Sequence, residues 1–351
     1  MKDQPMKHRS STLAHLNRYN TLLINNIQRY GFCPEYLNVA QEQYIAETRL
    51  LCQSRGIFFL LEQAKITHDT TNLVQAFNLY DMINEVYYDK NNATWQRQPQ
   101  TTHHELDIML YEYAFILTTL SKLYAHSKDQ VILERMFSTA EIIHQQFYIP
   151  NSNFIKLNKS PTGVGQNALM HLFEAYLEAY ISSKQNYFLD KLNQLGSEIM
   201  TLFYSPKDGL IKEYSAANIF EPGHSFEWAA LIYEASLHGS ELTNTLAHSQ
   251  LAAQAEKIGV VNNYLVLAEI DENTVKNAAS FRIWPSLERL RYYAMTNNQS
   301  KVDQTITPLY AKFFAPDGLP FEYIDQNYQA TEFKVKSTTG YHLINCFKYL
   351  V

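Results

Sequence analysis

The chain has 351 residues, a formal net charge of −6 at pH 7 and 46% hydrophobic residues, which is enough apolar material for a large core. The weak negative charge and the lack of a dense Lys/Arg run argue against nucleic acid as a partner. Cys33, Cys52 and Cys346 are too few and too scattered for a disulfide framework or a zinc site, and they suggest a reducing, cytoplasmic location. No apolar run approaches the length of a membrane span, so we expect no membrane partner.

Helical periodicity dominates the chain, because apolar residues recur at three- and four-residue steps. This pattern predicts eight helices: Leu13–Tyr30, Tyr44–Lys65, Thr71–Tyr87, Leu106–His126, Val131–Phe147, Asn167–Ile181, Tyr187–Phe203 and Ser225–Leu237. Alternating strand patterns are short, as in residues 211–214 and 320–323.

A similar aromatic turn follows several of these segments. Its clearest copies are VYYDKNNATW from Val86, QFYIPNSNFI from Gln146, LFYSPKDGLI from Leu202 and KFFAPDGLPF from Lys312. The steps are 60, 56 and 110 residues, and weaker copies at 28 and 257 fill the remaining positions. One helical hairpin cannot bury its own apolar face, so six must stack. We therefore predict an all-α, single-domain (α/α)6 barrel of about twelve helices over residues 1–351, with an open solenoid as the alternative.

The stretch EPGHSFEWAALIYE, Glu221–Glu234, carries the strongest local signal for chemistry. Pro222 and Gly223 begin a helix in which His224 and Glu227, three residues apart, share one face. A histidine supported by a carboxylate can act as an acid or base near neutral pH. QNALMHLFEAY repeats the layout with His171 and Glu174.

Polar residues recur once or twice per repeat in otherwise apolar segments, which predicts a polar pocket inside the barrel. The candidates are Arg55, Tyr111, Asn167, His171, His224, Glu227, Arg282, Trp284, Glu288 and His342. Only Arg55 and Arg282 among them carry positive charge, which argues against a phosphorylated ligand.

These segments resemble a known family. GQNALMHLFEAY, EPGHSFEWAALI, FRIWPSLERL and TTGYHLINC resemble, in that order, the signature segments of the N-acylglucosamine 2-epimerase superfamily, and QSRGIFF and LYEYAF resemble its first two. The resemblance covers nearly the whole chain and is most specific in the Pro-Gly-His-x-Phe-Glu-Trp run. That run and the Trp-Pro of residues 284–285 resemble the mannose isomerase branch most. The resemblance implies an (α/α)6 barrel that moves a proton at C2 of a reducing sugar.

The resemblance also implies roles for individual residues. His224 and His342 would be the acid/base pair, because histidine has an ordinary pKa of about 6.5. The other candidates would bind the sugar or orient these histidines: Arg55, Tyr111, Asn167, His171, Glu227, Trp284 and Glu288. Loss of the C2 proton gives a cis-enediolate, so neither a metal nor another cofactor is required. We expect a monosaccharide substrate, with D-mannose/D-fructose isomerisation first and N-acyl-D-glucosamine 2-epimerisation as the alternative, in a monomer or homodimer.

Other classes of protein remain open at this level. Two His-x-x-Glu helices offer two histidines and two glutamates to one divalent ion. A barrel of this kind can also bind carbohydrate without turnover. A glycoside hydrolase would need two carboxylates across the pocket, and the sequence offers no acid pair as well placed as the histidines.

Overall fold

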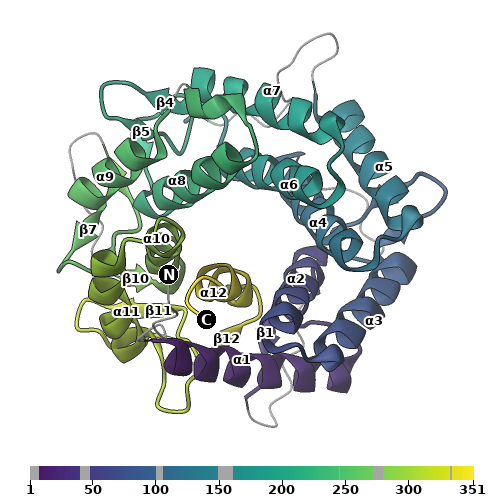
Figure 1. Ribbon diagram of the computed structural model, residues 1–351, viewed down its shortest axis with the longest axis horizontal. Helices are drawn as coiled ribbons and strands as arrows, with labels where there is room; N and C mark the ends of the chain where they lie inside the picture. Colours follow the sequence, from purple (N-terminus) through teal and green to yellow (C-terminus); the bar gives the residue numbers. More distant parts are fainter. Residues whose placement is uncertain are drawn as a thin grey trace, which may run out of the picture.

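Twelve α-helices form two concentric rings in the computed structural model, which describes residues 8–39, 48–99, 106–148, 161–244, 246–271, 280–332 and 334–351 (Figure 1). The inner ring consists of α2 (Leu50–Thr67), α4 (Leu106–Ser127), α6 (Asn167–Ser183), α8 (Pro222–Leu237), α10 (Ile283–Met295) and α12 (Thr339–Phe347). The outer ring consists of α1 (Arg9–Tyr30), α3 (Thr70–Val86), α5 (Gln130–Phe147), α7 (Asn186–Phe203), α9 (His248–Gly259) and α11 (Gln299–Phe313). This is the predicted (α/α)6 barrel.

The two rings differ in how their helices are buried. Outer helices are amphipathic; α3 buries Asn72, Ala76, Leu79, Tyr80 and Ile83 along one stripe. Inner helices are buried on nearly all sides, because they pack between the outer ring and one another. Their polar residues therefore lie inside the protein, where they need partners or a cavity. No helix within the described residues combines the length and apolar character required to cross a bilayer.

At one end of the barrel, three inner helices are joined to the next outer helix by two-residue turns: α2 to α3, α4 to α5 and α6 to α7. The first turn residue has a left-handed backbone conformation, with φ between 54° and 58° at His68, Lys128 and Lys184, and Asn297 has the same conformation in the three-residue turn from α10 to α11. In two of these turns the next residue is an aspartate whose carboxylate accepts a hydrogen bond from the first turn of the outer helix, as Asp129 does from Val131 N. These turns fix the hairpins and leave the longer connections to the opposite end.

The longer connections contain short antiparallel ladders, and the repeated aromatic turns lie there. The ladders are β1 (Tyr36–Leu37) with β12 (Val335–Lys336), β2 (Tyr88–Asp89) with β3 (Thr94–Trp95), β4 (Tyr204–Ser205) with β5 (Leu210–Ile211), β6 (Ile219–Phe220) with β9 (Ile270–Asp271), β7 (Val260–Val261) with β8 (Leu265–Val266), and β10 (Ser280–Arg282) with β11 (Tyr323–Asp325). The turns that begin at residues 86, 202 and 257 are the hairpins β2–β3, β4–β5 and β7–β8. The turn that begins at Gln146 lies outside the described residues from position 149 onward.

The chain closes into a ring. Helix α12 packs against α10, α1 and α2, and β12 pairs with β1 through Tyr36–Lys336 and Leu37–Val335. The closed ring excludes the open solenoid that the repeat alone allowed.

A buried ionic cluster ties three inner helices together below the cavity. Lys122 of α4 lies 2.6 Å from Glu178 of α6 and 3.4 Å from Glu62 of α2. All three side chains are under one-tenth exposed. The two carboxylates hold the lysine protonated, since a charge buried alone at this depth would be strongly unfavourable.

Candidate active site

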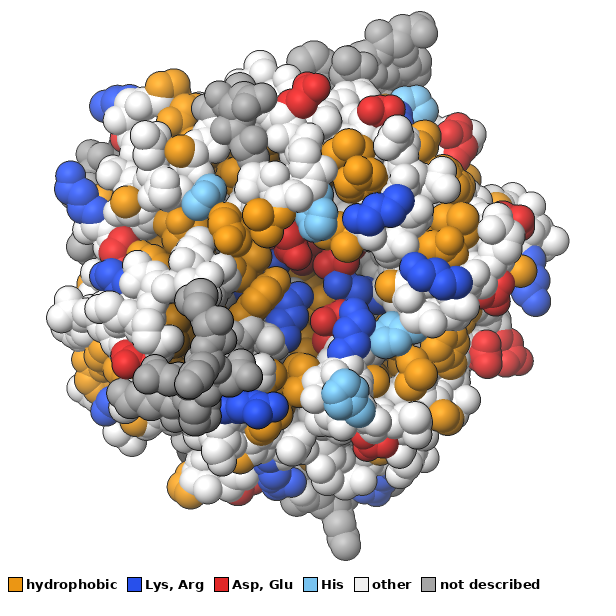
Figure 2. Space-filling model, in the orientation of Figure 1, with side chains coloured by type: hydrophobic (Ala, Val, Ile, Leu, Met, Phe, Trp, Pro, Cys, Tyr) orange, Lys and Arg blue, Asp and Glu red, His pale blue; other side chains and the backbone are white. Residues whose placement is uncertain are grey.

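A cavity of about 490 Å³ opens at the end of the barrel where the inner helices begin. Figure 2 shows basic, acidic and histidine side chains gathered in the hollow at the centre of this face. Eight of the nine predicted site residues line the cavity, together with Arg282: Arg55, Tyr111, Asn167, His171, His224, Glu227, Trp284 and His342. The ninth, Glu288, is fully buried behind His342.

Each predicted residue lies in the first two turns of its inner helix. The partial positive charge at a helix N-terminus favours negative charge nearby. Six helices therefore point these ends at the same space, which suits a negatively charged group in the cavity.

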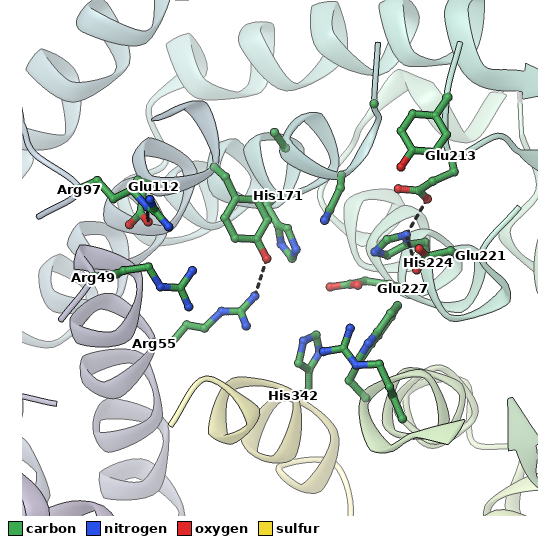
Figure 3. Close-up of a pocket in the computed structure, with 17 residues that line it drawn as sticks. Arg49, Arg55, Arg97, Glu112, His171, Glu213, Glu221, His224, Glu227 and His342 are labelled. Atoms are coloured by element: carbon green, nitrogen blue, oxygen red, sulfur yellow. Dashed lines mark hydrogen bonds and ion pairs between the residues drawn. The ribbon is translucent and has the colours of Figure 1, made fainter. Parts of the chain in front are cut away.

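His224 of α8 is held by two carboxylates that the sequence did not assign to it. Its Nδ1 lies 2.8 Å from Glu213 Oε2 and 3.3 Å from Glu221 Oε2, whereas the expected support from Glu227 is not formed (Figure 3). Burial lowers the pKa of His224, but Glu213 and Glu221 outweigh burial and raise it to about 10. His224 is thus an imidazolium at neutral pH.

The Trp of the Phe-Glu-Trp run explains how Glu213 is positioned, because it begins a chain of hydrogen bonds. Trp228 Nε1 donates to Gln166 Oε1 at 2.8 Å, and Gln166 Nε2 donates to Glu213 Oε2 at 3.0 Å. A tryptophan buried in α8 thereby orients, through α6, the carboxylate that holds His224.

His342 of α12 has a different environment. Its Nδ1 lies 2.7 Å from Glu288 Oε1, while the other oxygen of Glu288 accepts a hydrogen bond from Arg291 Nη1 at 3.1 Å. Burial lowers the pKa of His342, and the shared carboxylate only partly opposes this. A carboxylate only accepts, so Nδ1 carries the proton and Nε2 is the basic atom of a neutral ring.

His171 is a third buried histidine, and it forms the local pair that the second His-x-x-Glu motif predicts. Its Nδ1 lies 3.1 Å from Glu174 Oε2, which also accepts a hydrogen bond from the Tyr341 hydroxyl. Burial lowers the pKa of His171 to about 4, so the ring is neutral. Its edge-on contact with Tyr111, at 5.0 Å between ring centres, fixes the ring plane.

Glu227 lies between two other carboxylates at the floor of the cavity. It groups with His171 and Glu174 on one side and with Glu288 and His342 on the other. Its Oε1 is buried and has no hydrogen-bond partner among the described residues. Burial, Glu288 and Glu174 raise its pKa well above the ordinary value. Glu227 is therefore a neutral carboxylic acid that can donate a hydrogen bond into the cavity.

The remaining predicted residues shape the cavity between the histidines. Trp284 stacks obliquely with both, at 4.9 Å from the His224 ring centre and 5.6 Å from that of His342. Arg55 Nη2 donates to the Tyr111 hydroxyl at 2.8 Å. Asn167 Oδ1 is buried without a hydrogen-bond partner in the described part of the chain.

The four-ligand metal site that the sequence left open as an alternative is not assembled. His171, Glu174 and Glu227 come together, but His224 belongs to a separate group with Glu213 and Glu221. Within these groups His171 already pairs with Glu174, and His224 already pairs with Glu213. The donor set therefore fits hydrogen-bonded histidines better than a single divalent cation.

Sequence reasoning missed eight cavity residues. The residues that line the cavity without having been predicted are Arg49, Arg97, Glu112, Gly165, Ala168, Glu213, Tyr214 and Glu221. Glu213 carried a weak signal, since it lies within the short strand pattern of residues 211–214 just before the histidine helix. The two arginines carried none: Arg49 lies near the start of the predicted helix Tyr44–Lys65, at a position that the pattern did not mark, and Arg97 lies in a connection.

Comparisons with known proteins agree with this architecture. The sequence matches the N-acylglucosamine 2-epimerase (GlcNAc 2-epimerase) family over residues 46–346. A D-mannose isomerase is similar in structure at 14% identity and a TM-score of 0.83, with 100% of this chain and 99% of that chain covered. A cellobiose 2-epimerase from Bacillus thermoamylovorans B4167 is 14% identical with a TM-score of 0.81, and the match covers 97% of this chain and 99% of that chain. A sugar epimerase from a ruminal bacterium is 15% identical with a TM-score of 0.77, and the match covers 95% of this chain and 98% of that chain. No curated protein sequence matches.

Fold and site together define an (α/α)6-barrel enzyme of the isomerase class. The chain belongs to the N-acylglucosamine 2-epimerase family, whose members are sugar epimerases or isomerases. Which sugar it takes is a separate question, because structural similarity at these identities reaches no further than the fold.

Proposed function

We propose that this protein interconverts an aldose and its ketose by proton transfer between C2 and C1, with D-mannose and D-fructose as the best pair. Neutral His342 takes the C2 proton at Nε2, and the enediolate forms beside Arg55 and the helix N-termini. Protonated His224 and neutral Glu227 donate hydrogen bonds to O1 and O2, and through them a proton passes from the C2 hydroxyl to O1 as C2 becomes the carbonyl carbon. Trp284 packs on the sugar. His342 then returns the proton to C1.

The observation that carries this proposal is the unequal environment of the two histidines. His224 contacts two carboxylates, whereas His342 contacts one that it shares with Arg291. Epimerisation in both directions needs two groups that each serve as base in turn. A histidine held as an imidazolium is a poor base, so one-base transfer by His342 is favoured over a two-base epimerase.

Proton NMR in D2O tests the proposal, with D-mannose in one tube and N-acetylmannosamine in another. We expect fructose with deuterium at C1 in the first tube. Deuterium at C2 of N-acetylmannosamine, with inert mannose, would instead establish a 2-epimerase. If neither sugar changes, the carbohydrate-binding alternative or another sugar replaces this proposal.

Variants connect the reaction to the site. His342→Asn should abolish deuterium incorporation while the circular dichroism spectrum is retained. His68→Asn is the matched control, because His68 is an exposed residue in a left-handed turn that asparagine tolerates. A rate within about threefold of the wild type in His342→Asn would remove the proposed base.

A further inference from the structure

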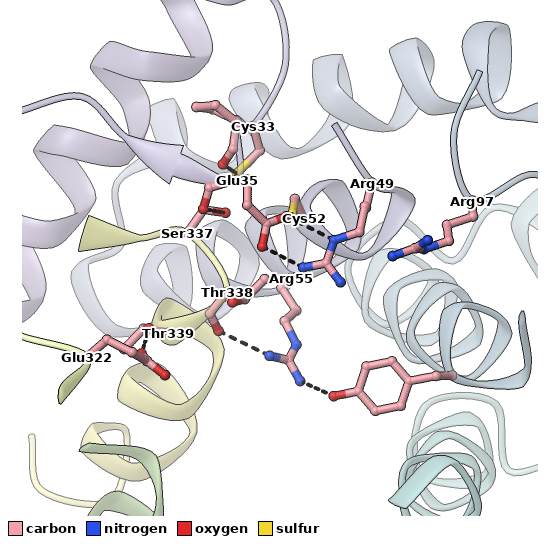
Figure 4. Close-up of polar contacts among 12 residues, drawn as sticks. Cys33, Glu35, Arg49, Cys52, Arg55, Arg97, Glu322, Ser337, Thr338 and Thr339 are labelled. Atoms are coloured by element: carbon pink, nitrogen blue, oxygen red, sulfur yellow. Dashed lines mark hydrogen bonds and ion pairs between the residues drawn. The ribbon is translucent and has the colours of Figure 1, made fainter. Parts of the chain in front are cut away.

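The cavity extends beyond the histidines to the side formed by α2 and α4. There it is lined by Arg49, Arg97 and Glu112, which Figure 3 shows across the cavity from His224. Figure 4 shows the Arg97 guanidinium directed toward that of Arg49, with Arg55 nearby. The expectation that only Arg55 and Arg282 supply positive charge is therefore wrong. Guanidinium groups that face one space repel each other unless an anion lies between them.

Both arginines are fixed before any ligand binds. Leu50 N, at the start of α2, donates to the Arg97 carbonyl at 2.8 Å, so the connection that bears Arg97 is tied to the helix that follows Arg49. Glu35 accepts from Arg49 Nε at 2.9 Å and from Nη2 at 2.6 Å. Cys52 Sγ donates to the same carboxylate at 2.9 Å. Such supported arginines lose little entropy when they bind a second group.

Donors remain unused on both side chains. Arg49 binds Glu35 through Nε and Nη2, so this ion pair does not use its Nη1. The contact that the structure shows for the Arg97 side chain is an ion pair from Nε to Glu112 Oε1 at 3.5 Å, and Nε is buried without a hydrogen bond in the described ranges. Both arginines are 23% exposed, so their free donors can reach a ligand in the cavity.

The local charge is positive. Arg49 pairs with Glu35 and Arg97 pairs with Glu112, and Arg55 adds a third positive charge nearby. Burial raises the pKa of Glu112 to about 7 against the opposing effect of both arginines, so this carboxylate is partly neutral at physiological pH. The lobe thus carries more than one uncompensated positive charge, which a neutral sugar leaves unpaired.

We propose that this lobe, made by Arg49, Arg97 and Glu112, binds an anionic group at the end of the sugar remote from C1 and C2. The substrate class is then a hexose with a terminal carboxylate or phosphate. The inference rests on the proposed function, because it places C1 and C2 at His342 and the charged end across the cavity. Planar guanidinium groups bind both anions through paired hydrogen bonds. A second neutral sugar ring would use an aromatic surface, which these three residues do not provide.

The test compares kcat/KM for D-mannose, D-mannuronate, D-mannose 6-phosphate and cellobiose, with deuterium incorporation as the readout. We expect at least one charged hexose to exceed mannose by tenfold or more. Arg97→Gln should lower this charged-to-neutral ratio at least tenfold, whereas Glu112→Gln should raise it, because the competing carboxylate is removed. Arg29→Gln, an exposed charge change on α1, is the control for net charge.

The outcomes separate the inference from the proposed function. Mannose turnover with no preference for either charged hexose would overturn the anion subsite and leave the isomerase intact, as would a preference for cellobiose. Turnover of none of the sugars would remove the proposed function. Calorimetric binding of mannuronate or mannose 6-phosphate, weakened in Arg97→Gln, would then still support the subsite, and no binding would overturn it. A carboxylate and a phosphate source are distinguished by which of the two is preferred.

Discussion

Replacing Glu213 with glutamine tests whether carboxylates keep His224 protonated. The change removes the negative charge 2.8 Å from Nδ1 and leaves a hydrogen-bonding amide of the same shape. A single opposite charge at such a distance moves a pKa by about 1–3. Because Glu221 remains 3.3 Å away, we expect the pKa of His224 to fall by about 2, which corresponds to roughly 2.7 kcal/mol.

The sign follows from the role of His224 as a donor. The protonated form is active, so activity is lost as pH rises through the pKa of His224, which is about 10 in the wild type. In Glu213→Gln the basic limb of the kcat/KM profile should move down to about pH 8. The loss of kcat/KM in Glu213→Gln, relative to the wild type, should therefore be largest above about pH 8.

The assay is the pH dependence of kcat/KM for the best substrate, measured over about pH 5 to 11. Enzyme held at each pH is returned to neutral and assayed again, so that unfolding is separated from titration. Glu134→Gln is the control, because Glu134 is an exposed carboxylate on α5. A basic limb that stays near 10 in Glu213→Gln would refute the claim that this carboxylate sets the charge of His224.

Three further predictions concern stability, packing and metals. Lys122→Met should lower the unfolding free energy by about 3–5 kcal/mol in urea titrations, because it leaves Glu62 and Glu178 buried without a counter-charge; the exposed Lys257→Met should change it by less than about 0.5 kcal/mol. Gly223→Ala would place a Cβ 2.7 Å from the Trp284 ring and 2.8 Å from Pro285 Cβ. We therefore expect the unfolding free energy to fall by about 1–3 kcal/mol and the tryptophan fluorescence to change. An unchanged spectrum with unchanged stability would contradict this contact. Dialysis against EDTA should leave activity intact, because the cavity histidines are already hydrogen-bonded to carboxylates; loss of activity that a divalent ion restores would revive the metal-dependent alternative.

The barrel was predictable because its helices repeat. Seven of the eight predicted helices start within four residues of the observed ones, as Thr71–Tyr87 does against α3 (Thr70–Val86). The eighth, Tyr44–Lys65, is observed from Leu50, and residues 44–47 lie outside the described ranges. The four later helices α9 to α12 were inferred from the count of repeats and not from their own patterns.

The carboxylates that bind the histidines were harder to predict than the histidines themselves. The His171–Glu174 pair is local and follows from helical spacing. His342 and Glu288 are 54 residues apart, and His224 takes Glu213 from a connection in preference to Glu227 on its own helix. Helical periodicity reports which face of one helix is buried, and it carries no information about which loop residue reaches that face.

The closure of the ring has a consequence for how the enzyme is made. Because α1 packs beside α12 and β1 pairs with β12, a growing chain lacks both the helix that packs against α1 and the proposed base His342 until α12 docks. A ribosome-bound chain that ends before α12 should therefore bind sugar poorly and catalyse nothing. A circularly permuted chain, with the present termini linked and new ones opened at the Lys128–Asp129 turn away from the cavity, should in contrast assemble the same site.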